Sequence, residues 1–206
     1  MSEDRAAHEP PRELPAARRL VHACFDSLDQ ARALLDAEPE LLFARDGLGE
    51  TALHYLAVED QLAAVQLLFE RGATLNTVSR VDGSPLSEAA SLGYAALVEW
   101  LLANGALVEM PGQGEPTLLN AVGSGSARVV SSLLDAGANP SLSNDVGETP
   151  LHAAATTDDR LPLTLLLLDA GADMHARCFD DTPLDVAIAS GARETAQLLR
   201  ARMGLD

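Results

Sequence analysis

Histidines and paired carboxylates are the first residues in this sequence that could carry chemistry. His54 and His152 each follow a leucine, but neither has a second His or Cys at i+4, so the spacing of a zinc site is missing. Asp158-Asp159 and Asp180-Asp181 stand in polar turn sequences, where we expect them to be solvated. Acid–base catalysis needs carboxyl groups in different environments within one pocket. We therefore expect no metal site, no cofactor, no catalytic residue and no enzymatic activity.

Glycine-rich segments and cysteines support the same interpretation. Gly47-Leu48-Gly49 and Gly112-Gln113-Gly114 lack the third glycine of a dinucleotide-binding loop, and Gly123-Ser124-Gly125-Ser126 does not have the offsets of a nucleophile elbow. These glycines are typical of turns that require positive φ. The two cysteines, Cys24 and Cys178, are too few for a disulfide framework, so we expect free thiols.

Composition and charge exclude several classes of partner. The chain has 206 residues and a formal net charge of −17, and its basic residues are all arginine. Nucleic acids and anionic membranes attract clustered Lys and Arg, so neither is an expected partner. The N-terminal sequence MSEDRAAHEPPREL lacks the basic start and apolar core of a secretory signal, so we expect a cytoplasmic protein. The bias towards arginine and alanine hints at a bacterial source.

A leucine recurs along the chain with a nearly constant spacing. It occupies Leu20, Leu53, Leu86, Leu118, Leu151 and Leu184, which gives steps of 33, 33, 32, 33 and 33 residues by subtraction. Around each of these leucines the apolar residues follow a helical period. A period near 33 residues predicts a stack of repeats, in which each helix pair buries its apolar side against its neighbours.

A second landmark shares this period. Gly-Ala follows a leucine-rich helical segment at Gly72-Ala73, Gly105-Ala106, Gly137-Ala138 and Gly171-Ala172, where the glycine is suited to end a helix with positive φ. In the fifth copy, Thr149 is suited to cap a helix that begins at Pro150, and Pro162 is suited to the first turn of the second helix. Each repeat is therefore expected to contain a turn, a helix, a second turn and a second helix.

The segments Gly147–Ala154 (GETPLHAA) and Asp169–Asp173 (DAGAD) resemble the ankyrin repeat. This resemblance implies an all-α ankyrin-repeat solenoid of helix-turn-helix units with short β-hairpin or turn fingers. We expect a disordered tail at 1–14 and one domain at 15–206, with repeats at about 15–45, 46–78, 79–110, 111–143, 144–176 and 177–206. The first and last repeats lack parts of the pattern and are suited to act as caps. The pattern is weakest at 109–118, and an insertion is expected at Asp158-Asp159.

The resemblance also implies where a partner would bind. Such proteins hold partners with the finger tips and the exposed side of the first helices. Three residues before the repeated leucine stand Glu50, Gly83, Glu115, Glu148 and Asp181, and five before it stand Leu48, Val81, Gln113, Val146 and Phe179. The first helices would add Val58, Glu59, Ser91, Leu92, Ser124, Thr156 and Thr157. A row of acids near helix starts is also explained by the helix dipole, but exposed apolar residues are typical of interaction surfaces.

We therefore expect a non-catalytic protein–protein interaction module that acts as a monomer and binds a protein partner with a basic surface. A narrower alternative is an acidic immunity or inhibitor protein that neutralises a basic toxin or nuclease. Adaptation to high salt is another explanation of the acidity.

Overall fold

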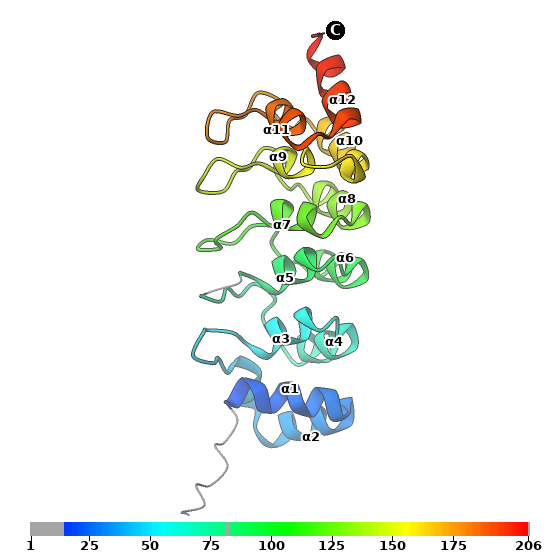
Figure 1. Cartoon of the computed structure of the whole chain (residues 1–206). Coiled ribbons are helices and arrows are strands. Elements are labelled where there is room, and N and C mark those ends of the chain that lie inside the picture. The colour runs from blue at the N-terminus through cyan, green and yellow to red at the C-terminus, as the bar shows by residue number, and fades with distance from the viewer. Residues whose placement is uncertain (1–14, 81–82, 206) are drawn as a thin grey trace, which may run out of the picture.

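The computed structural model describes residues 15–80 and 83–205. Helix pairs are stacked one above another from α1 to α12, and loops project from one side of the stack (Figure 1). The tail at 1–14 and the tip residue Val81 lie outside the described residues. None of the described helices is long and apolar enough to cross a membrane.

Each predicted repeat contains two helices. The first helices are α1 (Ala16–Asp26), α3 (Ala52–Val58), α5 (Pro85–Ser91), α7 (Thr117–Ser124), α9 (Pro150–Ala154) and α11 (Pro183–Ser190). The second helices are α2 (Leu28–Ala37), α4 (Leu62–Glu70), α6 (Ala95–Ala103), α8 (Ala127–Asp135), α10 (Leu161–Asp169) and α12 (Arg193–Met203). Two 3-10 segments, η1 (Pro39–Phe43) and η2 (Asp158–Arg160), complete the described helices. The all-α repeat architecture predicted from the period is confirmed.

Four of the first helices begin with reciprocal caps. In α9 the Thr149 hydroxyl accepts a hydrogen bond from the His152 N–H, and His152 Nδ1 accepts one from the Thr149 N–H at 3.2 Å. Because Nδ1 is an acceptor here, the imidazole proton belongs on Nε2. Equivalent capping boxes open α3, α5 and α11. His152 therefore has a structural role at the start of α9.

The second helices end as the Gly-Ala pairs predict. Gly171 has φ +87°, its N–H donates to the Leu168 carbonyl, and the Ala172 N–H donates to the Leu167 carbonyl. These two bonds form a Schellman motif, which satisfies carbonyl groups that the helix leaves open. The same pair of bonds ends α4, α6 and α8. The same Schellman motif therefore ends the second helix in four repeats.

The repeated leucines form the core between the stacked pairs. All six are buried, with 9% exposure at Leu184 and 2% or less at the other five. First helices contact first helices, from α1 to α3, α5, α7, α9 and α11 in turn, and among the second helices α8 contacts both α6 and α10. The spacing of the leucines thus gave the correct register, including the short step from Leu86 to Leu118.

The departures from the pattern also have structural counterparts. The insertion expected at Asp158-Asp159 forms η2 between α9 and α10. The projecting loops are turns rather than extended hairpins, and within 15–80 and 83–205 one isolated antiparallel bridge occurs, between Cys178 and Asp181. Some of these loops also bond to the next along the stack, as the Arg80 N–H donates to the Leu48 carbonyl.

The stacked arrangement makes a prediction about stability. Leu151 is fully buried, so Leu151→Ala should lower the free energy of unfolding by about 2–5 kcal/mol because it leaves a cavity between repeats. Leu165 on α10 is 37% exposed, and Leu165→Ala should change the free energy far less. Chemical denaturation followed by circular dichroism measures both. Equally small losses of unfolding free energy in the two variants would contradict the burial of Leu151 between repeats.

Candidate functional site

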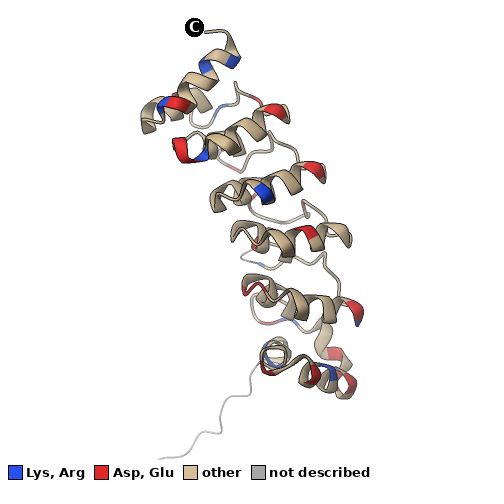
Figure 2. Ribbon diagram, turned by 90° about the vertical axis from the view of Figure 1, so that its right-hand side faces the viewer, with Lys and Arg blue, Asp and Glu red and all other residues tan. Residues whose placement is uncertain are grey.

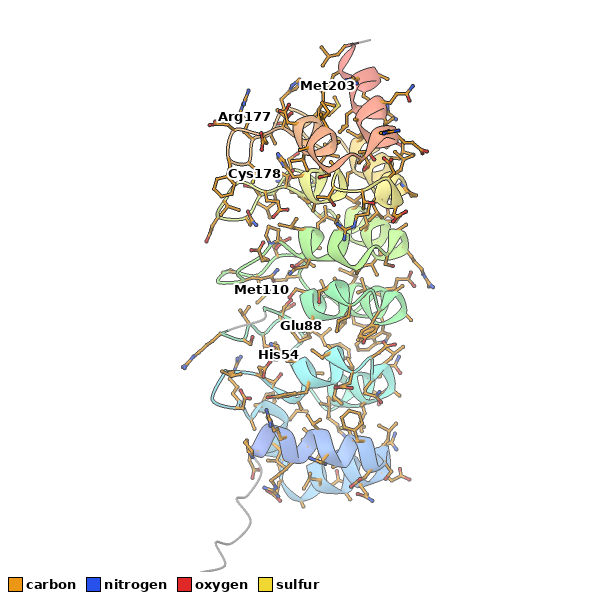
Figure 3. The ribbon with its side chains drawn as sticks, viewed as in Figure 1. His54, Glu88, Met110, Arg177, Cys178 and Met203 are labelled. Atoms are coloured by element: carbon orange, nitrogen blue, oxygen red, sulfur yellow. The ribbon has the colours of Figure 1, made fainter. Side chains whose placement is uncertain are left out.

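The loops before the first helices form the most distinctive surface of the stack. We call these loops the fingers, at 45–50, 79–83, 109–116, 143–148 and 177–181, and all but 81 and 82 of these residues are described. We use the term finger face for the fingers together with the exposed side of the first helices. Figure 3 shows Arg177 and Cys178 in the last finger and Glu88 on the side of α5 that faces the fingers. Since the fingers lie beside one another, side chains from different repeats meet on this face.

A hollow of about 380 Å³ lies in the middle of the finger face. It is lined by Ser87, Glu88 and Ser91 of α5, Asn120 of α7, Gly114 and Glu115 of one finger and Asp145 of the next. Helices and fingers therefore border the same concavity. Its three carboxylates come from three successive repeats and give it a negative charge. Sequence reasoning found Ser91 and Glu115 but missed Glu88, Asn120 and Asp145, because no single repeat shows which residues of its neighbours they face.

The apolar finger tips are exposed where the structure describes them. Leu48 and Val146 are nearly half exposed, and Phe179 is 80% exposed. Gln113 is different, because its side chain is half buried. Its Nε2 donates to Thr117 Oγ1 and to the Glu115 carbonyl, both at 2.8 Å. We conclude that Gln113 holds its own finger together, and we correct its expected position at an exposed tip.

The expected column of acids is only partly present. Glu50 is buried, at 9% exposure, because its backbone N–H and carbonyl are both bonded to Asp46 and its side chain lies against Tyr55. Burial and the hydrogen bond to Asp46 raise the pKa of Tyr55 to about 12. Glu148 is half buried, whereas Glu115 and Asp181 are exposed. The column therefore presents two exposed carboxylates among the described residues.

The exposed side of the first helices agrees better with the prediction. Val58, Glu59, Leu92 and Thr156 are exposed, whereas Ser91 and Ser124 are half buried. The remaining position, Thr157, is half buried, and its hydroxyl accepts a hydrogen bond from the Asp159 N–H, so it caps η2. A partner would therefore meet mainly small and apolar groups along these helices.

The histidines and cysteines have structural surroundings. His152 Nε2 lies 3.1 Å from the Asp181 carbonyl and ties α9 to the next finger. Burial lowers the pKa of His54 and raises the pKa of the Cys24 thiol to about 11, so both favour their neutral forms. Both cysteines are free thiols. In the described part of the chain, no three His, Cys, Asp or Glu side chains gather in a way that could hold a metal ion.

Asp158 corrects a second expectation. The sequence placed it in a solvated turn, but its Oδ1 accepts a hydrogen bond from the Thr195 N–H at 2.9 Å. Hydrogen bonds from this first turn of α12, above all that of Thr195, lower the pKa of Asp158. Asp158 therefore caps α12 from the preceding repeat. The insertion marked the loop at Asp158 as unusual. The sequence did not indicate that Asp158 would contact Thr195, which lies 37 residues further along the chain.

Glu109 is another contact that sequence reasoning missed. The fourth repeat has Pro116-Thr117 where the third, fifth and sixth repeats have Ser-Pro or Thr-Pro, so α7 lacks the usual cap. Glu109 Oε1 instead accepts the Thr117 N–H at 3.0 Å, and Gln113 Nε2 donates to its Oε2. Burial raises the pKa of Glu109 above its ordinary value, although the Thr117 N–H acts in the opposite direction. This finger therefore contains a half-buried carboxylate in place of a hydroxyl cap.

Acidic residues are not restricted to the finger face. Figure 2 views the stack from the side of the second helices and shows acids at the ends of several of them. Glu70, Asp135 and Asp169 end α4, α8 and α10, and Asp169 pairs with Arg202. The net charge alone therefore does not locate a binding surface. The hollow is distinguished because carboxylates, a concavity and apolar tips occur together.

Comparison with known protein families gives one family along the stack. A family model described as "Ankyrin repeats (3 copies)" matches residues 20–111 and again 113–206. These two matches cover nearly all the described helices. They agree with the repeat pattern and with the observed stack.

Curated relatives show the same repeats in much longer proteins. The chain is 33% identical over 165 residues to "Ankyrin repeat protein nuc-2" of Neurospora crassa, a match that covers 79% of this chain and 15% of that protein. It is 30% identical over 193 residues to "Ankyrin repeat and KH domain-containing protein mask-1" of Caenorhabditis elegans, which covers 91% and 7%. The chain thus spans a small part of these relatives. They do not bear out the bacterial source expected from the arginine bias.

The half-buried Glu109 predicts a pH dependence. A raised folded-state pKa means that the folded chain binds this proton more strongly than the unfolded chain does. The stabilisation from protonation is therefore fully present below the unfolded pKa and is lost as the pH rises through the folded pKa. Carboxyl NMR should show Glu109 titrating above 4.5, its ordinary value. The Tm of Glu109→Gln, relative to wild type, should rise between pH 4 and pH 7. A titration below 4.5 would contradict the role of burial.

Proposed function

The chain belongs to the ankyrin-repeat family, whose repeats are protein–protein interaction modules, and we propose that this one binds its partner through the finger face. The observation that carries the proposal is the acidic hollow, which is bordered by both the fingers and the first helices. A side chain that enters it would contact three repeats at once. The second-helix side offers acids as well, but its apolar side chains lie mostly between the stacked pairs.

The chemistry of the finger face favours a partner with basic and apolar side chains. An Arg or Lys of the partner would enter the hollow near Glu88, Glu115 and Asp145. Apolar residues of the partner would cover Leu48, Val146 and Phe179, which are exposed to solvent in the isolated chain. In such an interface the apolar contacts supply most of the affinity, whereas the charges accelerate association and select the partner. The proposal includes binding as a monomer in the cytoplasm.

The proposal predicts an effect of charge reversal within the hollow. Glu115 and Asp145 are exposed and line it from adjacent fingers, so Glu115→Lys with Asp145→Lys should slow association with the partner by about 10-fold or more at low salt. The remaining association should depend less on ionic strength. The partner is first captured from cells of the source organism and purified. Surface plasmon resonance then measures the association rate of wild type and variant at several ionic strengths.

A matched control separates position from net charge. Glu70 and Asp135 are exposed at the ends of second helices, and Glu70→Lys with Asp135→Lys changes the net charge equally. This variant should associate at nearly the wild-type rate, and circular dichroism should show that both variants fold. Equal slowing in the two variants would reject the hollow as the contact and leave only a general effect of charge.

A further inference from the structure

The 177–181 finger differs from the others in its backbone. Its two central residues, Phe179 and Asp180, have φ of +48° and +71°. Reciprocal bonds close the turn, from Cys178 N–H to the Asp181 carbonyl at 2.9 Å and from Asp181 N–H to the Cys178 carbonyl at 3.0 Å. Positive φ at both central positions of such a turn is ordinarily supplied by Asn-Gly or Gly-Gly. An aromatic residue there is a backbone outlier.

The other four fingers place glycine at positive φ, at Gly49, Gly83, Gly112 and Gly147. Gly49 and Gly147 have φ of +83° and +86°, and each donates its N–H back across a turn, to the Asp46 and Asn144 carbonyls. The last finger therefore adopts a strained conformation that its neighbours avoid. Such strain persists only where the surrounding structure enforces it, and it occurs most often where function requires it.

The surroundings enforce this turn firmly. Arg177 donates from Nη1 to the Asp180 carbonyl at 2.5 Å, and His152 Nε2 lies 3.1 Å from the Asp181 carbonyl. The preceding finger also touches it, since a Cβ at Gly147 would lie 2.7 Å from the Arg177 carbonyl oxygen. The turn is thus fixed by its own repeat and by the repeat before it. The backbone that carries the aromatic tip is therefore held in place before any partner arrives.

Among residues 15–80 and 83–205, none packs closely enough around the Phe179 ring to compensate for this conformation. Phe179 is 80% exposed, more than any other large apolar side chain that the structure describes. Asp180 and Asp181 beside it are exposed too. Val146 is 48% exposed at the tip of the adjoining finger. The tip therefore presents an exposed apolar ring on a fixed backbone with carboxylates beside it, and its complement is an apolar pocket with positive charge at its edge.

We propose that Phe179 is the anchor of the interface, and that its ring enters an apolar pocket on the partner protein bordered by Arg or Lys. Those cations pair with Asp180 and Asp181, and a guanidinium can also stack on the ring. Because the backbone of the turn is already fixed, less conformational entropy is lost on binding, and this preorganisation increases the affinity. This inference rests on the proposed function and names the residue and the partner surface that matter most.

Site-specific photo-crosslinking tests the contact directly. Variants carrying p-benzoylphenylalanine in place of Phe179, Leu48, Val146 or Leu165 are irradiated in cells of the source organism, and the adducts are mapped by mass spectrometry. The probe at Phe179 should crosslink to apolar residues of one partner protein with Arg or Lys close in its sequence or structure. The probe at Leu165, on a second helix, should give no such adduct.

The other outcomes distinguish the two proposals. Adducts from Leu48 and Val146 without one from Phe179 would overturn the anchor and leave the finger face as the binding surface. If the probes at Phe179, Leu48 and Val146 crosslink no more than the probe at Leu165, both the anchor and the finger face as the binding surface would be rejected. An adduct from Phe179 to an acidic segment, or to a second copy of this chain, would also overturn the inference.

Two substitutions of Phe179 separate its role in binding from its effect on the fold. Phe179→Ala and Phe179→Gly both remove the ring, and each should weaken binding to the crosslinked partner by about 10-fold or more. Only glycine relieves the positive φ, so Phe179→Gly should melt about 2–4 °C above Phe179→Ala in differential scanning calorimetry. Near-wild-type affinity in either variant, or equal Tm values, would contradict the strained anchor.

Discussion

Burial of leucine between neighbouring helix pairs is the interaction on which the whole structure depends. A pair such as α9 and α10 has no second layer of its own, so Leu151 and Leu167 are buried only because other repeats lie above and below them. Many apolar side chains of the stack are therefore buried between neighbouring repeats. Residues that point away from the stack contribute little to folding. The fingers and the exposed side of the first helices are consequently free to carry function.

Sequence could predict those parts of the fold that repeat. The spacing of the leucines fixes the helix pairs, the Gly-Ala pairs fix the ends of four second helices, and Thr149-Pro150 fixes a helix start. Each of these signals is local to one repeat and appears several times. The agreement between independent local signals is what made the register reliable.

Contacts between repeats could not be predicted in the same way. Asp158 caps α12 across 37 residues, and Glu109 replaces a missing cap with a side chain from the loop before it. For the same reason sequence found several tips of the finger face but missed the hollow, whose lining residues come from three successive repeats. The positive φ at Phe179 could not be predicted from the sequence either, because it depends on support from the neighbouring finger.

Amide hydrogen exchange of the chain with and without saturating partner tests the central claim most directly, since it reports every repeat at once. If the partner binds the finger face, new protection should appear at the finger amides around 46–50, 144–148 and 178–181 and at the C-terminal ends of α3, α5 and α9. The amides of α4, α6, α8 and α10, already protected by the stack, should exchange at unchanged rates. New protection confined to the second helices, with the fingers exchanging as in the free chain, would contradict binding at the finger face.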